Sequence, residues 1–114
     1  MRFFTSLFGK PGAAVKKVNV LKKPDFMKRL KELNGVLIDV RTRKEFLEDH
    51  IQSARNINFN DTDFLKKFTR FNKSQALFIY CRSGARSQRA ARKLAKNGFT
   101  EIYNLKGGFM SWQQ

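Results

Sequence analysis

The sequence predicts an α/β domain with a mainly parallel central sheet. Two near-continuous apolar runs, residues 36–40 and 76–80, are typical of strands that are buried on both faces. Segments with helical periodicity alternate with these runs and with shorter ones, which is the pattern of parallel strands connected by helices. With 114 residues, of which 41% are hydrophobic, the chain has room for one compact domain and enough apolar side chains for its core.

Residues 1–17 differ from the rest and are predicted to form an N-terminal tail or connector, which leaves residues 18–114 for the domain. The apolar run of the tail is interrupted by Thr5 and Ser6 and has no small-residue cleavage site, so it does not match a secretory signal. Two interpretations stay open: a frayed terminus, and a weak contact of this Phe-rich, basic tail with a membrane surface or a partner. No run reaches the roughly 20 apolar residues of a membrane span, so no transmembrane segment is predicted.

The first elements of the domain are expected to be a strand, a helix and a second strand. Residues 18–21 predict the first strand, and Pro24 begins a helix whose apolar residues share one face. Gly35 ends this helix, and the left-handed conformation is expected at that glycine. The buried strand over residues 36–40 follows.

The middle of the chain predicts less regular structure. Residues 43–49 are expected to form a short helix with Phe46 and Leu47 directed inward. Residues 51–59 are mixed in character and expected to be extended. Residues 61–71 place Phe and Leu side chains at helical spacing, and these aromatic residues are interpreted as core filling.

The last third predicts a strand, a long helix, a strand and a short helix. The strand over residues 76–80 is followed by a helix over residues 87–97, with Ala and Leu on one face, Arg and Lys on the other, and Gly98 as its cap. A final strand covers residues 101–105. The pair Gly107–Gly108 then turns the chain into a short terminal helix.

The segment after the strand 76–80 is the one from which chemistry is expected. Cys81 follows the strand directly, and ligand sites in parallel sheets lie at the carboxyl ends of strands. The loop ends at a helix N-terminus, where free N–H groups and the helix dipole favour negative charge. Small side chains let the backbone curve, and two arginines add positive charge, so the pKa of Cys81 is expected to lie below that of a free cysteine. The loop residues concerned are Arg82, Ser83, Gly84, Ala85 and Arg86.

The sequence allows three interpretations of this cysteine. An inert buried thiol is the usual fate of a lone cysteine, but it needs neither flanking arginines nor a Gly-turned loop. A thiolate held by several donors is instead a nucleophile with an anion-binding pocket around it. Cysteine-dependent phosphatases resemble this loop but place five residues between Cys and Arg, whereas four residues separate Cys81 from Arg86. The shorter loop suits a smaller target such as the terminal sulfur of a persulfide, and an oxyanion hydrolase (a phosphatase or arsenate reductase) stays as the alternative.

Four ordered motifs resemble the rhodanese family, and the likeness runs from about residue 18 to the end. The loop is similar to the six-residue active loop of the thiosulfate-using members, because arginine stands at its second and last positions. Two departures from the family pattern, Asp49 before the histidine and Asn58 where proline is common, fall in predicted surface turns. The resemblance implies a rhodanese-like three-layer fold, in which helices cover both faces of the central sheet. The motifs are Leu37–Arg41 with Glu45 and Phe46; His50 and Ile51 with Ala54, Asn56 and Ile57; Cys81–Arg86; and Leu105–Gly108 with Trp112.

The same resemblance implies a thiosulfate sulfurtransferase with Cys81 as the nucleophile. Its thiolate would attack the outer sulfur of a small anionic donor such as thiosulfate, release sulfite and hold a persulfide, from which cyanide, a thiol or an acidic protein would take the sulfur. No cofactor is expected, and no metal either, since one Cys and one His are too few ligands for a structural zinc site. That histidine, His50, is expected to be structural, because the loop favours the thiolate without a base.

The remaining site residues are expected to act in different ways. Arg86 either binds the leaving sulfite or braces the loop by pairing with a carboxylate, and Arg82 is expected to face solvent and attract the anion. Asp39 and Arg41 are expected to support the loop as a buried pair, each satisfying the other or the loop backbone. Glu45 is a further candidate partner for Arg41.

The formal charge of +15, from 24 Lys and Arg against nine Asp and Glu, predicts a surface that attracts anions. Much of it falls on predicted helix faces, where a solvated surface and the steering of anions are both consistent with the pattern. The lack of an aromatic-and-basic stacking motif argues against nucleic acid as the partner, so a basic, non-catalytic binding module ranks third among the functions. One free thiol without a disulfide suits a reducing compartment, which predicts a cytoplasmic protein.

Overall fold

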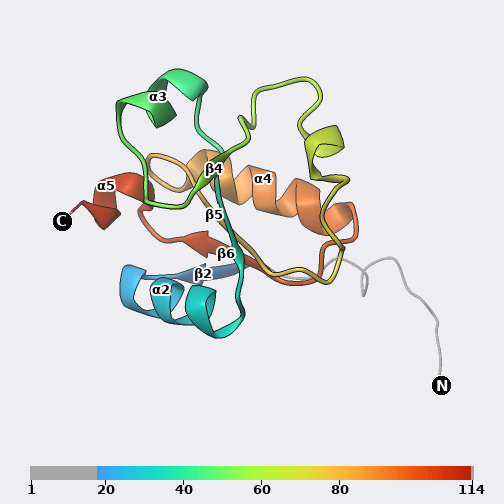
Figure 1. Ribbon diagram of the computed structural model, residues 1–114, viewed down its shortest axis with the longest axis horizontal. Helices are drawn as coiled ribbons and strands as arrows, with labels where there is room; N and C mark the ends of the chain where they lie inside the picture. The colour runs from blue at the N-terminus through green and yellow to red at the C-terminus, as the bar shows by residue number, and fades with distance from the viewer. Residues whose placement is uncertain (1–17, 114) are drawn as a thin grey trace.

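The computed structural model describes residues 18–113, which form a five-stranded parallel sheet with helices on both faces (Figure 1). The α/β fold class predicted from the sequence is therefore confirmed, whereas the tail predicted over residues 1–17 lies outside the described residues. The strands are β2 (Asn19–Leu21), β3 (Val36–Asp39), β4 (Arg55–Asn56), β5 (Leu77–Tyr80) and β6 (Ile102–Leu105). The helices are α2 (Lys23–Glu32), α3 (Arg43–Glu48), α4 (Ala85–Lys96), α5 (Gly108–Trp112) and the 3-10 turn η1 (Leu65–Phe68).

The strand order β2-β6-β5-β3-β4 puts β5 in the centre of the sheet. Leu77, which begins β5, lies opposite Val36 of β3 and Ile102 of β6. The three strands are therefore in step, and their carboxyl ends meet at one edge of the sheet. The loops that follow β3, β5 and β6 all begin at this edge, which brings the predicted site residues together.

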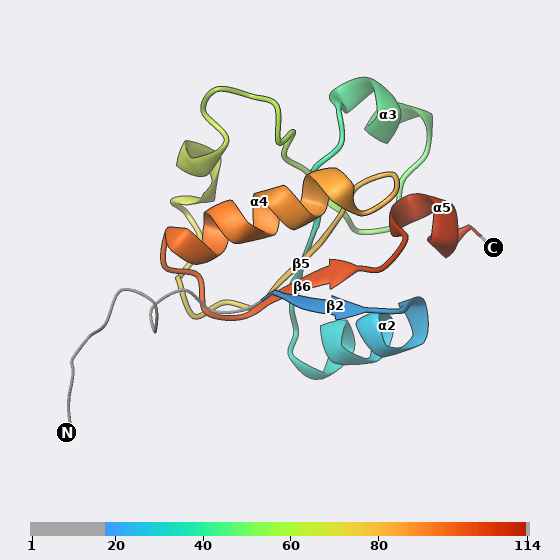
Figure 2. The same ribbon diagram turned by 180° about the vertical axis from the view of Figure 1, so that it is seen from behind.

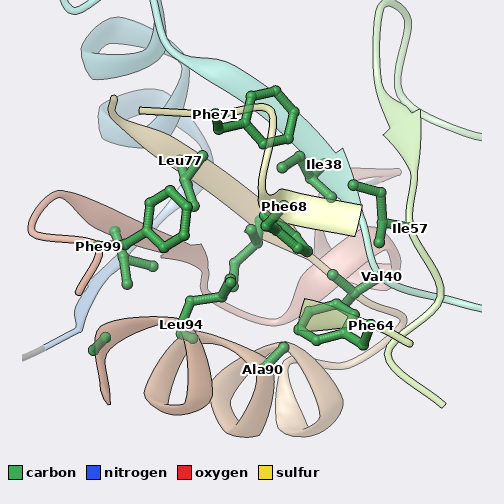
Figure 3. Packing of buried hydrophobic residues seen from close by; sticks show 14 of the residues in the cluster. Ile38, Val40, Ile57, Phe64, Phe68, Phe71, Leu77, Ala90, Leu94 and Phe99 are labelled. Atoms are coloured by element: carbon green, nitrogen blue, oxygen red, sulfur yellow. The ribbon is translucent and has the colours of Figure 1, made fainter. Parts of the chain in front are cut away.

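Helices cover the two faces of the sheet unequally. α2 and α5 pack on one face, and α4 packs with η1 on the other, as the two opposite views show (Figures 1 and 2). The larger core lies between the sheet and α4, where Phe64, Phe68 and Phe71 meet apolar strand residues (Figure 3). Within residues 18–113, no helix combines the length and the apolar character needed to pass through a membrane.

Both long helices end with a left-handed residue just after the cap. After α4 this residue is Gly98 (φ 102°), as predicted. After α2 it is Asn34 (φ 49°), so the prediction of a left-handed Gly35 is wrong. Asparagine tolerates this backbone region better than most residues, which explains the difference. Gly35 is needed for another reason, because a Cβ at this position would overlap the ring of Phe78.

Two predicted helices differ from the observed ones. The helix expected over residues 61–71 is reduced to the single turn η1, although its phenylalanines are still buried because the flanking turns keep the rings on the core side. Leu47 is 64% exposed rather than directed inward. Phe46 is half-buried and stacks on His50, with 3.8 Å between the ring centroids. α3 lies beyond the edge of the sheet and so has no sheet face to pack against, and none of its residues is fully buried (Figure 1).

Candidate active site

Cys81 lies at the carboxyl end of the central strand and begins a loop that passes directly into α4. Gly84 turns this loop with a φ of 110°, a conformation that favours glycine. The turn directs donors back to the cysteine: the Sγ accepts hydrogen bonds from the amide of Gly84 at 3.1 Å, and from the amide and hydroxyl of Ser87 at 3.4 and 3.3 Å. The sulfur thus occupies the place where an N-cap oxygen normally accepts hydrogen bonds from the first turn of a helix.

The pKa of Cys81 is lowered as the outcome of opposing effects. Burial is the largest single influence and raises the pKa, since the residue is only 1% exposed. Hydrogen bonds from the hydroxyl and amide of Ser87, and then from the amides of Gly84 and Ser83, lower the pKa and together outweigh burial. The thiolate is therefore stabilised by neutral donors of the loop and of the first turn of α4, an environment that favours a nucleophilic sulfur.

Ser87 belongs to this site, although the sequence analysis placed it only at the start of a helix. Its side chain is fully buried, and its hydroxyl lies 3.3 Å from the Sγ of Cys81 and 3.2 Å from the carbonyl oxygen of Gly84. One hydroxyl proton serves one acceptor at a time, and negative charge on the sulfur favours Sγ. The sequence feature that could have indicated this role is the position of Ser87 as the third residue of α4, from which a side chain reaches back to the N-cap.

The N-terminus of α5 forms the floor under the loop. The amide of Phe109 donates to the carbonyl oxygen of Cys81 at 2.8 Å, and the amide of Met110 donates to that of Arg82 at 3.0 Å. Gly108 permits this close approach, because a Cβ there would lie 2.5 Å from both carbonyl oxygens. Its φ of 59° also lies in the left-handed region. The Gly107–Gly108 turn predicted from the sequence thus has a structural role under the cysteine.

Arg86 braces the loop in this structure. Its two terminal nitrogens donate to the two carboxylate oxygens of Glu45, at 2.8 and 3.0 Å. Glu45 in turn accepts from the backbone and side chain of Thr42 in a capping box at the start of α3. Hydrogen bonding to Arg86 is the largest influence on Glu45 and lowers the pKa of its carboxyl to about 2. The loop is therefore tied to α3 by a bidentate ion pair.

Asp39 and Arg41 form a buried ion pair next to the floor. The Nη2 of Arg41 lies 2.7 Å from the Oδ2 of Asp39, and the Nε and the backbone amide of Arg41 also donate to this carboxylate. The carboxylate is fully buried and Arg41 is 5% exposed. Glu45, expected as a further partner of Arg41, pairs with Arg86 instead because it faces the loop from α3. The guanidinium of Arg41 lies 4.6 Å from the ring centroid of Phe109 and so reaches the floor rather than the loop itself.

A cavity of about 250 Å³ opens beside the loop. Cys81 is not among its lining residues, because the loop encloses the sulfur and leaves the residue 1% exposed. Arg82 is exposed and lines the cavity, and the side chains of Ser83 and Ala85 are exposed to solvent. The full lining is Arg41, Glu45, Glu48, Asp49, Arg82, Phe109, Met110 and Gln113.

His50 is separate from the loop. Its ring stacks on Phe46, and its Nδ1 lies 2.9 Å from the carbonyl oxygen of Phe46, at the end of α3. The structure therefore gives it local contacts with the preceding helix α3 and no hydrogen bond with the cysteine. Across residues 18–113, no group of three or more His, Cys, Asp or Glu residues is arranged to hold a metal ion.

Comparison with known proteins gives the same picture. A family model described as the rhodanese-like domain matches residues 23–114. YqhL of Bacillus subtilis, an uncharacterized protein, is 50% identical over 76 residues, which cover 67% of this chain and 59% of that protein, so the chain spans less than two thirds of its length. The thiosulfate sulfurtransferase GlpE of Pseudomonas fluorescens is 31% identical over 91 residues, or 79% of this chain and 81% of that protein. The crystal structure of a rhodanese-like domain protein from Staphylococcus aureus has a TM-score of 0.71 and 27% identity, and covers 82% of this chain and 90% of that one.

The matched region contains every element of the site. It begins in α2 and includes the central strand with its cysteine loop, the helix that the loop caps, and the turn that forms the floor. The structural similarity confirms the rhodanese-like three-layer arrangement that the motifs implied. On the motifs, the sheet and these similarities together, the chain belongs to the rhodanese-like domain family.

Proposed function

We propose that this protein is a sulfurtransferase that carries sulfane sulfur as a persulfide on Cys81, with thiosulfate or a similar small anion as its donor. One observation carries the proposal: three hydrogen-bond donors, the amide of Gly84 and the amide and hydroxyl of Ser87, converge on the Sγ of Cys81. Such a cradle stabilises a thiolate before the reaction and a persulfide anion after it. The similarity to the thiosulfate sulfurtransferase GlpE of Pseudomonas fluorescens supports thiosulfate as the donor.

The reaction divides into two displacements at sulfur. The Cys81 thiolate attacks the outer sulfur of thiosulfate, a sulfur–sulfur bond forms, and sulfite leaves with the electron pair of the broken bond. A thiolate or cyanide then attacks the outer sulfur of the persulfide, and the Cys81 thiolate is regenerated. Arg82 attracts the incoming anion, while Arg86 keeps the loop in place through Glu45. Both reaction steps require Cys81 to be a free thiol, so we propose that the protein works in a reducing compartment such as the cytoplasm.

Intact-mass spectrometry tests the proposal directly. After incubation with thiosulfate and removal of excess reagent, the protein should be one sulfur atom heavier and sulfite should appear in equal amount. Cys81→Ser should abolish both signals. Ser74→Ala should abolish neither, because it changes an exposed residue before the start of β5, at the opposite end of that strand from the loop.

Two results would contradict the proposal. The first is wild-type protein that never gains the sulfur atom under conditions free of reducing agent. The second is release of phosphate from an aryl phosphate with strict dependence on Cys81, which would indicate an oxyanion hydrolase built on the same kind of loop.

A further inference from the structure

α4 has one face buried in the core and one cationic face exposed to solvent. The inner face consists of small and aliphatic side chains that are almost completely buried, so the position of the helix is fixed. The outer face follows the helix from its second turn to its last residue. We refer to four exposed side chains as the α4 cationic face: Arg89, Arg92, Lys93 and Lys96.

Nothing in the described part of the chain neutralises this face. The helix contains no acidic residue, and across residues 18–113 none of the four side chains forms an ion pair. Two pairs of like charges, Arg89 with Lys93 and Arg92 with Lys96, stand four residues apart, a spacing that destabilises a helix. By contrast, Arg86 of the loop pairs with Glu45, and Lys67 of η1 pairs with two aspartates.

The cationic face starts next to the nucleophile. The first turn of α4 donates to the Sγ of Cys81, and at about 1.5 Å per residue the four cations lie within about 17 Å of the N-terminal end of the helix along its axis. Figure 2 shows α4 across the front of the molecule, with no other element over its outer side. A molecule that lies along α4 therefore has one end beside the cysteine loop.

We propose that the α4 cationic face binds an acidic segment of a protein that takes sulfur from Cys81. This inference rests on the proposed sulfurtransferase function and names the class of its acceptor. Carboxylates repeated once per helical turn in a partner helix match the spacing of the four cations. Nucleic acid fits less well, because the large hydrophobic side chains exposed within residues 18–113 include no aromatic ring on which a base would stack.

The transfer needs no additional reactant. A thiolate of the docked protein attacks the outer sulfur of the Cys81 persulfide, and a new sulfur–sulfur bond forms on the partner. The bond to the Sγ breaks, and its electron pair returns to Cys81 as the thiolate. The partner leaves with a persulfide, and its carboxylates have served only to place its thiol at the loop.

Two synthetic peptides test the docking. Both form a helix with one terminal cysteine, and one carries glutamates along a single face where the other carries glutamines. The α4 variant is Arg92→Gln with Lys93→Gln and Lys96→Gln. The matched control removes the same charge from the opposite face of the sheet, at exposed lysines by α2, with Lys22→Gln, Lys28→Gln and Lys31→Gln. The rate of transfer from persulfidated protein to each peptide is divided by the rate to 2-mercaptoethanol, a neutral thiol.

At low salt, the wild-type protein should transfer sulfur to the glutamate peptide about tenfold faster than to the glutamine peptide. The α4 variant should lose most of this preference, and the α2 control should keep it. Equal rates with the two peptides, or equal losses in the two variants, would overturn the proposal. A short single-stranded oligonucleotide that binds more tightly than the glutamate peptide, and does so through the α4 cationic face, would overturn the choice of partner.

Binding can be separated from chemistry. Fluorescence anisotropy with a glutamate peptide that carries serine in place of cysteine measures docking alone. If thiosulfate never transfers sulfur to Cys81, the proposed function fails. The anisotropy measurement still shows whether the α4 cationic face binds an acidic peptide. Binding that weakens for the α4 variant but not for the α2 control supports the docking surface. Equal binding to both variants overturns it.

Discussion

At the scale of single residues, the acidity of Cys81 comes from groups without net charge. The strongest influences that lower its pKa are the hydroxyl and amide of Ser87 and the loop amides, and they act against burial. Arg86, which the sequence suggested as a source of positive charge, spends its hydrogen bonds on Glu45. The arginine that stays available to an incoming anion is Arg82, which is exposed beside the cavity.

The Ser87→Ala substitution should raise the pKa of Cys81. It removes the charge-assisted hydrogen bond from the hydroxyl, so less thiolate is present at neutral pH and sulfur uptake should slow by about tenfold. Above the raised pKa the thiolate is fully formed again, and most of the loss should disappear. A pH profile of sulfur uptake measures this, with Ser74→Ala as the matched control; a uniform loss at every pH would show that the hydroxyl does not act on the ionisation.

We expect the buried pair of Asp39 and Arg41 to contribute to stability. Asp39→Ala leaves a guanidinium that is 5% exposed without its carboxylate, which should lower the free energy of unfolding by about 3–5 kcal/mol. Urea denaturation measures the loss. The double change Asp39→Ala with Arg41→Met removes both charges and should be more stable than the single one. If the double variant is the less stable of the two, burial of an unpaired charge is not the cause.

At the scale of elements, the conformation around Cys81 depends on α5, a helix to which the cysteine does not belong. The amides of Phe109 and Met110 in α5 hold the carbonyl groups of Cys81 and Arg82, which fixes the orientation of the two peptide planes that follow the cysteine. Gly108 allows that contact, and α5 is itself packed into the core through Phe109. The site is therefore assembled from two segments, one after β5 and one after β6.

Gly108→Ala should separate this role from ordinary backbone strain. The new Cβ would lie 2.5 Å from backbone oxygens that cannot move without displacing the loop, so sulfur uptake should fall by at least about tenfold. Gly98→Ala is the control, because its φ is also left-handed but its Cβ would meet only the flexible side chain of Lys73. Both variants should lose about 1 kcal/mol or more of stability in urea, and only Gly108→Ala should lose activity. Equal activity in the two variants would remove α5 from the site.

Elements with a strong periodic pattern were predictable, and elements held by irregular contacts were not. The strands at 36–40 and 76–80 and the helix α4 have patterns that their burial explains fully. Residues 61–71 have helical spacing, but most of that segment forms turns. The spacing of the phenylalanines requires that their rings reach the core, and a chain of turns meets that requirement as well as a helix does. The cysteine loop was identified from small residues, arginines and its place before a helix. The Glu45 brace and the Ser87 hydroxyl required knowledge of which distant or buried groups face one another.

At the scale of the whole molecule, the excess of positive charge should attract approaching anions. With a formal charge of +15, long-range attraction should draw anions to the surface before any specific contact forms. Fixed cations also repel one another, so this charge opposes compaction while it favours encounter. The two effects respond to salt in opposite directions, which makes ionic strength an informative variable.

The second-order rate of sulfur uptake from thiosulfate should fall several-fold when salt rises from about 0.01 M to about 0.3 M, because the screening length shrinks from about 30 Å to below 8 Å. Stopped-flow detection of sulfite release measures this rate. Alkylation of Cys81 by neutral iodoacetamide is the control and should change little. If both rates fall together, salt acts on the ionisation of the thiol and not on the approach of the anion.

The placement of α5 beneath the cysteine loop also sets an order in time. A ribosome delivers Cys81 before Gly108 and Phe109, so an emerging chain has its thiol before it has the amides that hold the neighbouring carbonyl groups. Without α5 the loop that directs the donors of Gly84 and Ser87 to the sulfur lacks its support, so we expect the thiol to be less acidic during that interval and to react with oxidants more slowly than the thiolate of the folded protein. We therefore expect Cys81 to become reactive only after α5 has been synthesised.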